Sequence, residues 1–210
     1  MADVEFFWDP VCPWAWITSR WMVEVQSQRR LEIDWKFISL RFVNQDRDYA
    51  AEFPEGYLRT HTEGLRLLRA AAALRRSAGP EAMFGLYTAF GEIIHDARNR
   101  DALYETPAIA DVLGQLGHKR APADAADGTD FDDVIQAETT EALDRCGGFV
   151  GTPVISFAPP EGPSFFGPVF SRVPKGEEAL ALWDAAVTLG RYPHFAELKR
   201  TNRSRPDPSR

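Results

Sequence analysis

Cys12 is the residue of this chain whose position most clearly indicates chemistry. It lies in the segment DPVCPWAW, residues 9–16, between a short apolar stretch and a segment with helical spacing. A cysteine at the amino end of a helix lies among unpaired backbone N–H groups, and the helix dipole there stabilises a thiolate. We therefore predict that Cys12 is a reactive nucleophile with a lowered pKa, exposed in a turn between Pro10 and Pro13. The alternative is a small, buried, apolar cysteine.

The residue three positions after Cys12 is Ala15, where a dithiol enzyme would carry a second cysteine. In a Cys-x-x-Cys site, the second sulfur lies on the same helix face and resolves the mixed disulfide that the first one forms. Cys12 can therefore form a mixed disulfide, but another group must release it. Cys146 is the other cysteine of the chain, and we interpret it as a helix end that Gly147 and Gly148 close. A small thiol from solution is the expected resolving group.

A second motif, GTPV at residues 151–154, stands at the start of a strand-like segment. We predict a cis peptide bond between Thr152 and Pro153, because the cis form costs little only before proline and usually marks a site. An ordinary trans bond at a strand edge is the alternative. A cis-proline loop would face Cys12 and offer backbone groups to an extended substrate.

Two further side chains could border a pocket beside Cys12. Trp14 could form one wall for a flat substrate, or it could cover the core. His95 follows an apolar helix face and could act as an acid or a hydrogen-bond donor, although a lone histidine is more often part of the packing. None of the four histidines has metal-ligand spacing, so we predict no metal site.

The elements that would position these residues follow from hydrophobic periodicity. Strands are expected at 3–9 and 31–40 with a helix at 14–28 between them, so Cys12 falls at the carboxyl end of the first strand. Helical spacing or caps then occupy residues 56–78, 80–97, 106–117 and 130–146. A hairpin at 150–160 and 164–171 and a last helix at 176–190 complete the order.

This order predicts an α/β protein with a thioredoxin-like fold and an α-helical insertion domain. We place the thioredoxin-like domain at residues 1–50 and 147–198 and the helical insertion at 51–146. Residues 199–210 lack a periodic apolar pattern and are expected to form a disordered tail.

Composition narrows the range of partners. A net charge of −7 and a pI near 5.2 argue against nucleic acid and anionic lipid, which both require a basic face. No segment resembles a signal peptide or a membrane span, and two cysteines fit a reducing compartment. We therefore expect a cytoplasmic protein that acts on a small molecule.

Three segments of the chain carry a resemblance to a known family. FFWDPVCPWAWITSRW (6–21), FFGPVFSRVPKGEEALALWD (165–184) and YPHFAELKRT (192–201) are similar to the mycothiol-dependent nitroreductases. That family belongs to the DsbA-type branch of thioredoxin-like proteins and is related to the FrnE-like and kappa-class transferase groups. In the helical middle of the chain, the similarity to this family is loose and is clearest at residues 86–95.

The resemblance implies a homodimeric, cytoplasmic reductase that receives electrons from the small thiol mycothiol. By position, it implies that Cys12 is the attacking thiolate, that Trp14 and Asn44 line the substrate pocket, and that Pro153 is the cis-proline. Members of the family carry Cys-Pro-Trp-Cys, from which Ala15 departs. The chain is then a natural monothiol variant, a non-redox relative, or an engineered Cys→Ala form.

Three functions fit these observations. In the first, Cys12 attacks a disulfide or an activated substrate, and mycothiol or a similar small thiol resolves the adduct. In the second, the protein is a thiol-dependent isomerase or transferase of the kappa-class type, in which residue 12 and the helix amino terminus hold a cofactor's thiolate. The third is a non-catalytic thioredoxin-fold module that binds a small molecule or a partner.

Overall fold

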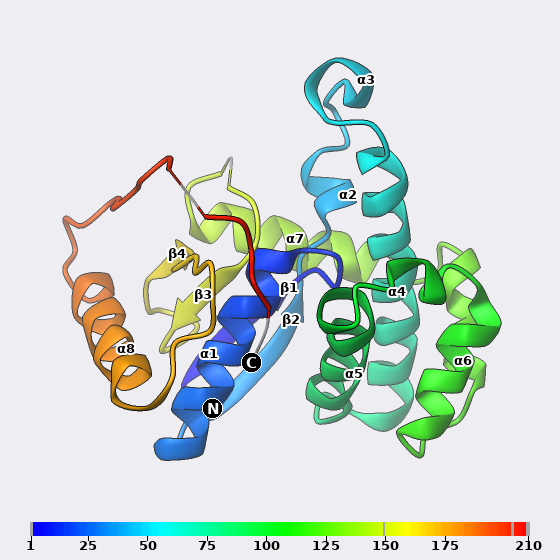
Figure 1. Ribbon diagram of the computed structural model, residues 1–210, viewed down its shortest axis with the longest axis horizontal. Coiled ribbons are helices and arrows are strands. Elements are labelled where there is room, and N and C mark those ends of the chain that lie inside the picture. Colours follow the sequence, from blue (N-terminus) through cyan, green and yellow to red (C-terminus); the bar gives the residue numbers. More distant parts are fainter. Residues whose placement is uncertain (1, 149, 203, 209–210) are drawn as a thin grey trace.

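The computed structural model of the chain is built around a four-stranded mixed sheet (Figure 1). β1 (Val4–Trp8) pairs in parallel with β2 (Ile33–Phe37) and antiparallel with β3 (Val154–Phe157). β4 (Ser164–Phe166) completes the order β2-β1-β3-β4. α1 (Pro13–Gln28) connects β1 with β2. The predicted β-α-β unit and the predicted hairpin are both confirmed.

The remaining elements are helical. The four predicted helical segments correspond to α4, to α5 with the π-helix η1, to α6 and to α7, whereas α2, α3, η2 and η3 are too short to leave a periodic pattern. Their bounds are α2 (Leu40–Val43), α3 (Tyr49–Glu52), α4 (Tyr57–Ala78), α5 (Ala82–Gly91), η1 (Glu92–Asp96), η2 (Arg100–Leu103), α6 (Thr106–Gln115), η3 (Ala121–Asp127), α7 (Asp132–Arg145) and α8 (Gly176–Gly190).

Helices cover both faces of the sheet. Side chains alternate along β1, so Phe6 and Trp8 join the large cluster that includes residues of α1 and α8, whereas Phe7 joins a smaller cluster with Ala142 of α7. α4, α5 and α6 form a group on one side of the sheet in Figure 1. Cys12 belongs to the large cluster, on the side of the sheet that carries α1.

The structure describes residues 2–148, 150–202 and 204–208. Within those ranges no helix combines the length and apolar character needed to cross a membrane. The division into a thioredoxin-like domain and an insertion at 51–146 stays a prediction. Three residues of the predicted disordered tail, at positions 203, 209 and 210, lie outside the described residues.

Candidate active site

Cys12 is the N-cap residue of α1 and directly follows the loop after β1. Its Sγ accepts a hydrogen bond from the Ala15 N–H, with 3.5 Å between sulfur and nitrogen, and its S–H donates to the Thr152 carbonyl oxygen, also at 3.5 Å. Pro13 stands in the first turn of the helix, where the missing N–H is not needed. The predicted place of Cys12, between a strand end and a helix start, is confirmed.

The prediction of an exposed Cys12 with a lowered pKa is wrong. Only 5% of its surface is exposed, and burial raises the pKa of its thiol to about 12. The N–H groups of Ala15 and Trp14 favour the thiolate, but burial outweighs them, and the negative charge of Asp9 adds to the effect of burial. Cys12 is therefore a protonated thiol at neutral pH when the protein has this conformation.

Labelling of Cys12 by iodoacetamide should accelerate about tenfold per pH unit between about pH 7 and pH 10, because only the thiolate reacts. Peptide mass spectrometry would follow the two cysteines separately, and circular dichroism would show that the protein stays folded. Cys146, whose pKa burial raises to about 11, is the internal comparison. A plateau for Cys12 below about pH 9 would contradict the prediction.

The cis-proline loop lies directly against Cys12. The Thr152–Pro153 peptide bond, for which the sequence predicts the cis form, is cis in the structure. The Thr152 hydroxyl donates to the Phe7 carbonyl oxygen, with 3.4 Å between the two oxygens, which ties the loop to β1. Two motifs that are 140 residues apart in the chain are thus brought into contact.

Asp9 is a buried carboxylate beneath the active-site turn, and no sequence motif singles it out. One carboxylate oxygen accepts from the Val11 N–H and the other from the Leu40 N–H, at 2.9 and 2.8 Å. Burial raises its pKa to about 7, against the effect of these hydrogen bonds and of Arg100. The charge of Asp9 therefore changes near neutral pH, and the net charge around Cys12 changes with it.

Gly64 allows α4 to approach the Asp9 carboxylate closely. A Cβ atom at Gly64 would lie 2.8 Å from Asp9 Oδ1, which is closer than real Cβ atoms approach. A glycine in the middle of a long helix costs helix stability. Here it lets α4 pack against the turn that carries Cys12.

His95 lies beside the active-site turn as part of η1. Its Nε2–H donates to the Pro10 carbonyl oxygen at 2.9 Å, and its ring stacks on Trp16. Burial lowers its pKa to about 4, with Arg100 adding to the effect. The predicted role as an acid is therefore not available at neutral pH in this conformation, since the ring is neutral and its N–H is already used.

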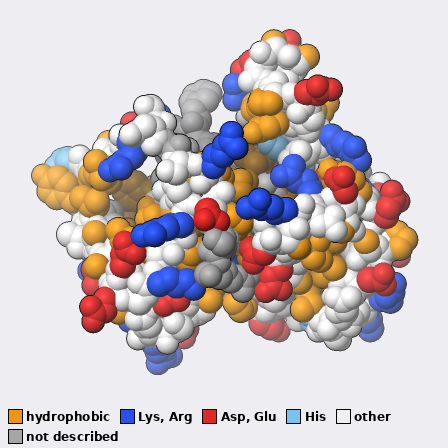
Figure 2. Space-filling view, viewed as in Figure 1, with side chains coloured by type: hydrophobic (Ala, Val, Ile, Leu, Met, Phe, Trp, Pro, Cys, Tyr) orange, Lys and Arg blue, Asp and Glu red, His pale blue; other side chains and the backbone are white. Residues whose placement is uncertain are grey.

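A cleft of about 710 Å³ opens beside Pro13, the residue after Cys12, although Cys12 itself is not among its lining residues. It is bounded by the start of α1, by η1 and the segment after it, and by the C-terminal segment (residues 204–208), through Pro13, Ile94, His95, Arg98, Asn99, Arg100, Asp101, Arg205, Pro206 and Pro208. Figure 2 shows Lys and Arg side chains gathered near the middle of the face on which the C-terminal segment crosses α1. The cleft is large enough for a small molecule.

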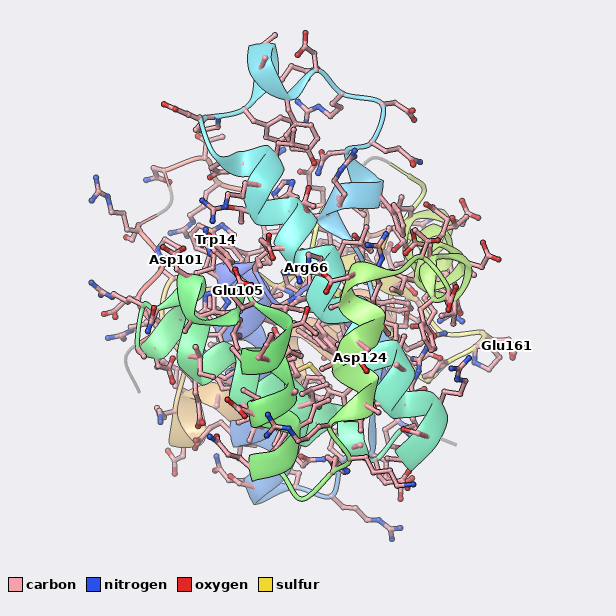
Figure 3. The ribbon with its side chains drawn as sticks, turned by 90° about the vertical axis from the view of Figure 1, so that its right-hand side faces the viewer. Trp14, Arg66, Asp101, Glu105, Asp124 and Glu161 are labelled. Carbon is pink, nitrogen blue, oxygen red and sulfur yellow. The ribbon has the colours of Figure 1, made fainter. Side chains whose placement is uncertain are left out.

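The other two predicted pocket residues do not line this cleft. Trp14 is partly buried and packs against the large cluster, and Figure 3 shows it at the amino end of α1, on the side of the molecule where Asp101 lies. Asn44 is 7% exposed, and its side-chain amide donates to the Leu40 carbonyl oxygen at 2.8 Å. Their roles in substrate binding stay predictions.

Cys146 ends α7, as predicted. It is the C-cap residue, Gly147 and Gly148 follow with positive φ angles, and the Gly148 N–H donates to the Leu143 carbonyl oxygen at 2.8 Å. Cys146 packs on the smaller cluster, whereas Cys12 belongs to the large one, and both thiols are free. Among the described residues, no group of three or more His, Cys, Asp or Glu side chains could hold a metal ion.

The chain is similar in sequence to a known family and to a mycobacterial protein. A family model described as "Rv2466c-like: Mycothiol-dependent nitroreductase Rv2466c" matches residues 11–200. The uncharacterized protein Rv2286c of Mycobacterium tuberculosis is 33% identical over 203 residues, which span 95% of this chain and 82% of that protein.

Two solved oxidoreductases share the fold. The probable DsbA oxidoreductase SCO1869 from Streptomyces coelicolor aligns with a TM-score of 0.59 and 14% identity, over 96% of this chain and 94% of that one. Oxidoreductase DsbA from Xylella fastidiosa aligns with a TM-score of 0.53 and 16% identity, over 89% and 86% of the two chains. The predicted thioredoxin-like α/β fold of the DsbA type is confirmed.

Proposed function

Because this chain belongs to the Rv2466c-like family of mycothiol-dependent nitroreductases, we propose that it is a thiol-dependent oxidoreductase in which Cys12 is the single attacking sulfur. The observation that supports this most is the position of the Cys12 sulfur. It lies at the amino end of α1 within reach of both the Ala15 N–H and the Thr152 carbonyl. A substrate disulfide that docks along the cis-proline loop would meet this sulfur first.

Different groups around Cys12 favour its protonated and its ionised forms. The Thr152 carbonyl accepts the S–H of the resting thiol, whereas the Ala15 N–H and the helix dipole favour the thiolate. Ionised Cys12 attacks one sulfur of a disulfide, and the other sulfur leaves with the electron pair and takes up a proton. A small thiol, mycothiol by family membership, supplies the sulfur that releases Cys12.

The cleft beside Cys12 suits such a thiol. Its volume of about 710 Å³ and its lining of polar groups, among them Asn99 and Asp101, match a small molecule rich in hydroxyl and amide groups. We propose that the partners are a small-molecule substrate and this thiol, not nucleic acid or a membrane, which agrees with the net charge of −7. We also propose a cytoplasmic homodimer, as family membership implies.

Intact-mass measurement after incubation with oxidised small thiols tests the proposal. We expect one adduct per chain, mapped to Cys12, which disappears when the reduced thiol is added. Cys146→Ser should still form the adduct and Cys12→Ser should not. An adduct confined to Cys146, or none under conditions that label free cysteine, would overturn the proposal.

A second candidate function is favoured by the burial of Cys12. A protonated thiol with a pKa of about 12 is a poor nucleophile but can donate a hydrogen bond. The protein would then be a thiol-dependent isomerase or transferase of the kappa-class type, in which residue 12 holds a cofactor's thiolate. Cys12→Ser should keep activity in this case, whereas the first function predicts its loss.

A further inference from the structure

The cleft beside Cys12 is basic, although the protein as a whole is acidic. Three of its lining residues are Arg98, Arg100 and Arg205, and the one carboxylate among them is Asp101. The net charge of the chain is −7, so a local excess of positive charge is unexpected. Groups of like charge around a small cleft raise the local concentration of the opposite charge.

These guanidinium groups lack ion-pair partners among the described residues. Within the described part of the chain, none of the three forms an ion pair, whereas Arg69 and Arg75 each pair with a carboxylate at 2.6 and 2.7 Å. Asp101, the carboxylate in the lining, acts on Tyr104, whose pKa is raised by burial and by this carboxylate. The positive charge of the cleft is therefore available to a ligand.

Arg100 is held in place by a neutral group. One of its terminal nitrogens donates to the Thr60 hydroxyl at 3.0 Å, and its buried Nε has no hydrogen-bond partner among the described residues. Its charge contributes to lowering the pKa values of His61 and His95 and that of Asp9. The positive charge of Arg100 thus acts on Asp9, at the start of the turn that carries Cys12, and on His95 beside that turn.

Arg98 occupies a backbone conformation that rarely suits arginine. Its φ angle is 53°, in the left-handed region, directly after η1. Hydrogen bonds from the Ala97 N–H to Glu92 and from the Asn99 N–H to Ile93 hold this turn. Glycine or asparagine would fit the turn with less strain.

We propose that this cleft binds a carboxylate of the substrate, so that Cys12 reacts preferentially with small disulfides that carry negative charge. This inference rests on the proposed function, because it requires Cys12 to be the attacking sulfur. The carboxylate would lie among Arg98, Arg100 and Arg205 while the disulfide reaches Cys12 past Pro13, and the resolving thiol would enter the same cleft after the leaving thiol has departed. Disulfide exchange itself proceeds as described above.

Three disulfides of similar size and different charge test the proposal: dithiodipropionate, bis(2-hydroxyethyl) disulfide and cystamine. We measure the rate at which each disulfide modifies Cys12 and the rate at which it reacts with N-acetylcysteinamide, an uncharged thiol. The ratio of the two rates corrects for differences in the intrinsic reactivity of the disulfides. We expect the anionic disulfide to be favoured over the neutral one by about tenfold and the cationic one to be disfavoured by a similar factor. Added salt should shrink both ratios.

Arginine variants show whether the cleft is responsible. Arg98→Asn removes the charge with a residue that tolerates the left-handed turn, and Arg100→Gln keeps a donor for Thr60. Each should lower the ratio of anionic to neutral rates by about threefold or more. Arg191→Gln, which removes an exposed charge at the end of α8, should leave the ratio unchanged.

The outcomes separate this inference from the proposed function. If no disulfide modifies Cys12, the proposed function fails. If Cys12 reacts without charge preference, or if the preference survives both cleft substitutions, the carboxylate site is wrong and the proposed function stands. Should Arg100→Gln fail to fold, Arg98→Asn and the salt dependence of the parent protein decide.

Discussion

An Ala15→Cys variant should close an intramolecular disulfide with Cys12 and should no longer accumulate mixed disulfides with small thiols. The Ala15 N–H already lies 3.5 Å from the Cys12 sulfur, so the first turn of α1 brings the two positions together. Under mild oxidation the chain should lose the mass of two hydrogens. Because an intramolecular thiol has an effective concentration in the millimolar range or above, the adduct should decay about a hundredfold faster than in the parent.

The matched control for this experiment is Ala15→Ser, which adds one side-chain heavy atom but no sulfur. Ala15 is fully buried, so each variant adds one heavy atom to a packed position. Ala15→Ser should keep the long-lived adduct on Cys12, measured by intact mass after removal of excess disulfide. If Ala15→Cys also retains the adduct, then the geometry of the first turn does not support dithiol chemistry.

The fold could be predicted because its main elements have local signals. The pattern predicts a last helix at 176–190, which occupies Gly176–Gly190, and a first strand at 3–9, which occupies Val4–Trp8. Apolar periodicity and flanking proline or glycine are enough to find such elements. The short helices between α1 and α4 lack room for a repeat, and so they were missed.

The candidate site was predictable only in part. The positions of Cys12 at a helix start and of Thr152 opposite it follow from two motifs and the order of the elements. The burial of Cys12 does not, because it depends on how η1 and α4 pack over the turn. Asp9 and the arginines of the cleft were missed for the same reason, since their role comes from neighbours that are distant in the chain.

The close packing on α1 of the junction between α5 and η1 depends on Gly91, the last residue of α5. A Cβ atom at Gly91 would lie 2.1 Å from Cζ3 of Trp16. Trp16 cannot easily move, because it is fully buried, its Nε1–H donates to Asp96 at 2.8 Å, and the Arg20 guanidinium lies 4.1 Å from its ring centroid. This contact places η1, and with it His95, over the turn that carries Cys12.

Gly91→Ala should therefore be strongly destabilising. Forcing a methyl group into this contact should cost about 3 kcal/mol of unfolding free energy, which corresponds to a fall in Tm of about 10 °C for a chain of this size. Gly85→Ala is the matched control in the same helix, because a Cβ there meets no atom within 4 Å. It should stabilise the protein slightly, since alanine favours a helix over glycine. Thermal unfolding followed by circular dichroism measures both.

The same substitution should also change the chemistry of Cys12. If η1 is pushed away from α1, water reaches the thiol, the pKa of Cys12 falls, and labelling at neutral pH becomes faster. Gly85→Ala should leave the labelling rate unchanged. A Gly91→Ala protein that is as stable as the parent and labels at the same rate would mean that Trp16 and η1 do not pack as described. A destabilised protein with unchanged labelling would mean instead that this contact supports the fold without keeping Cys12 buried.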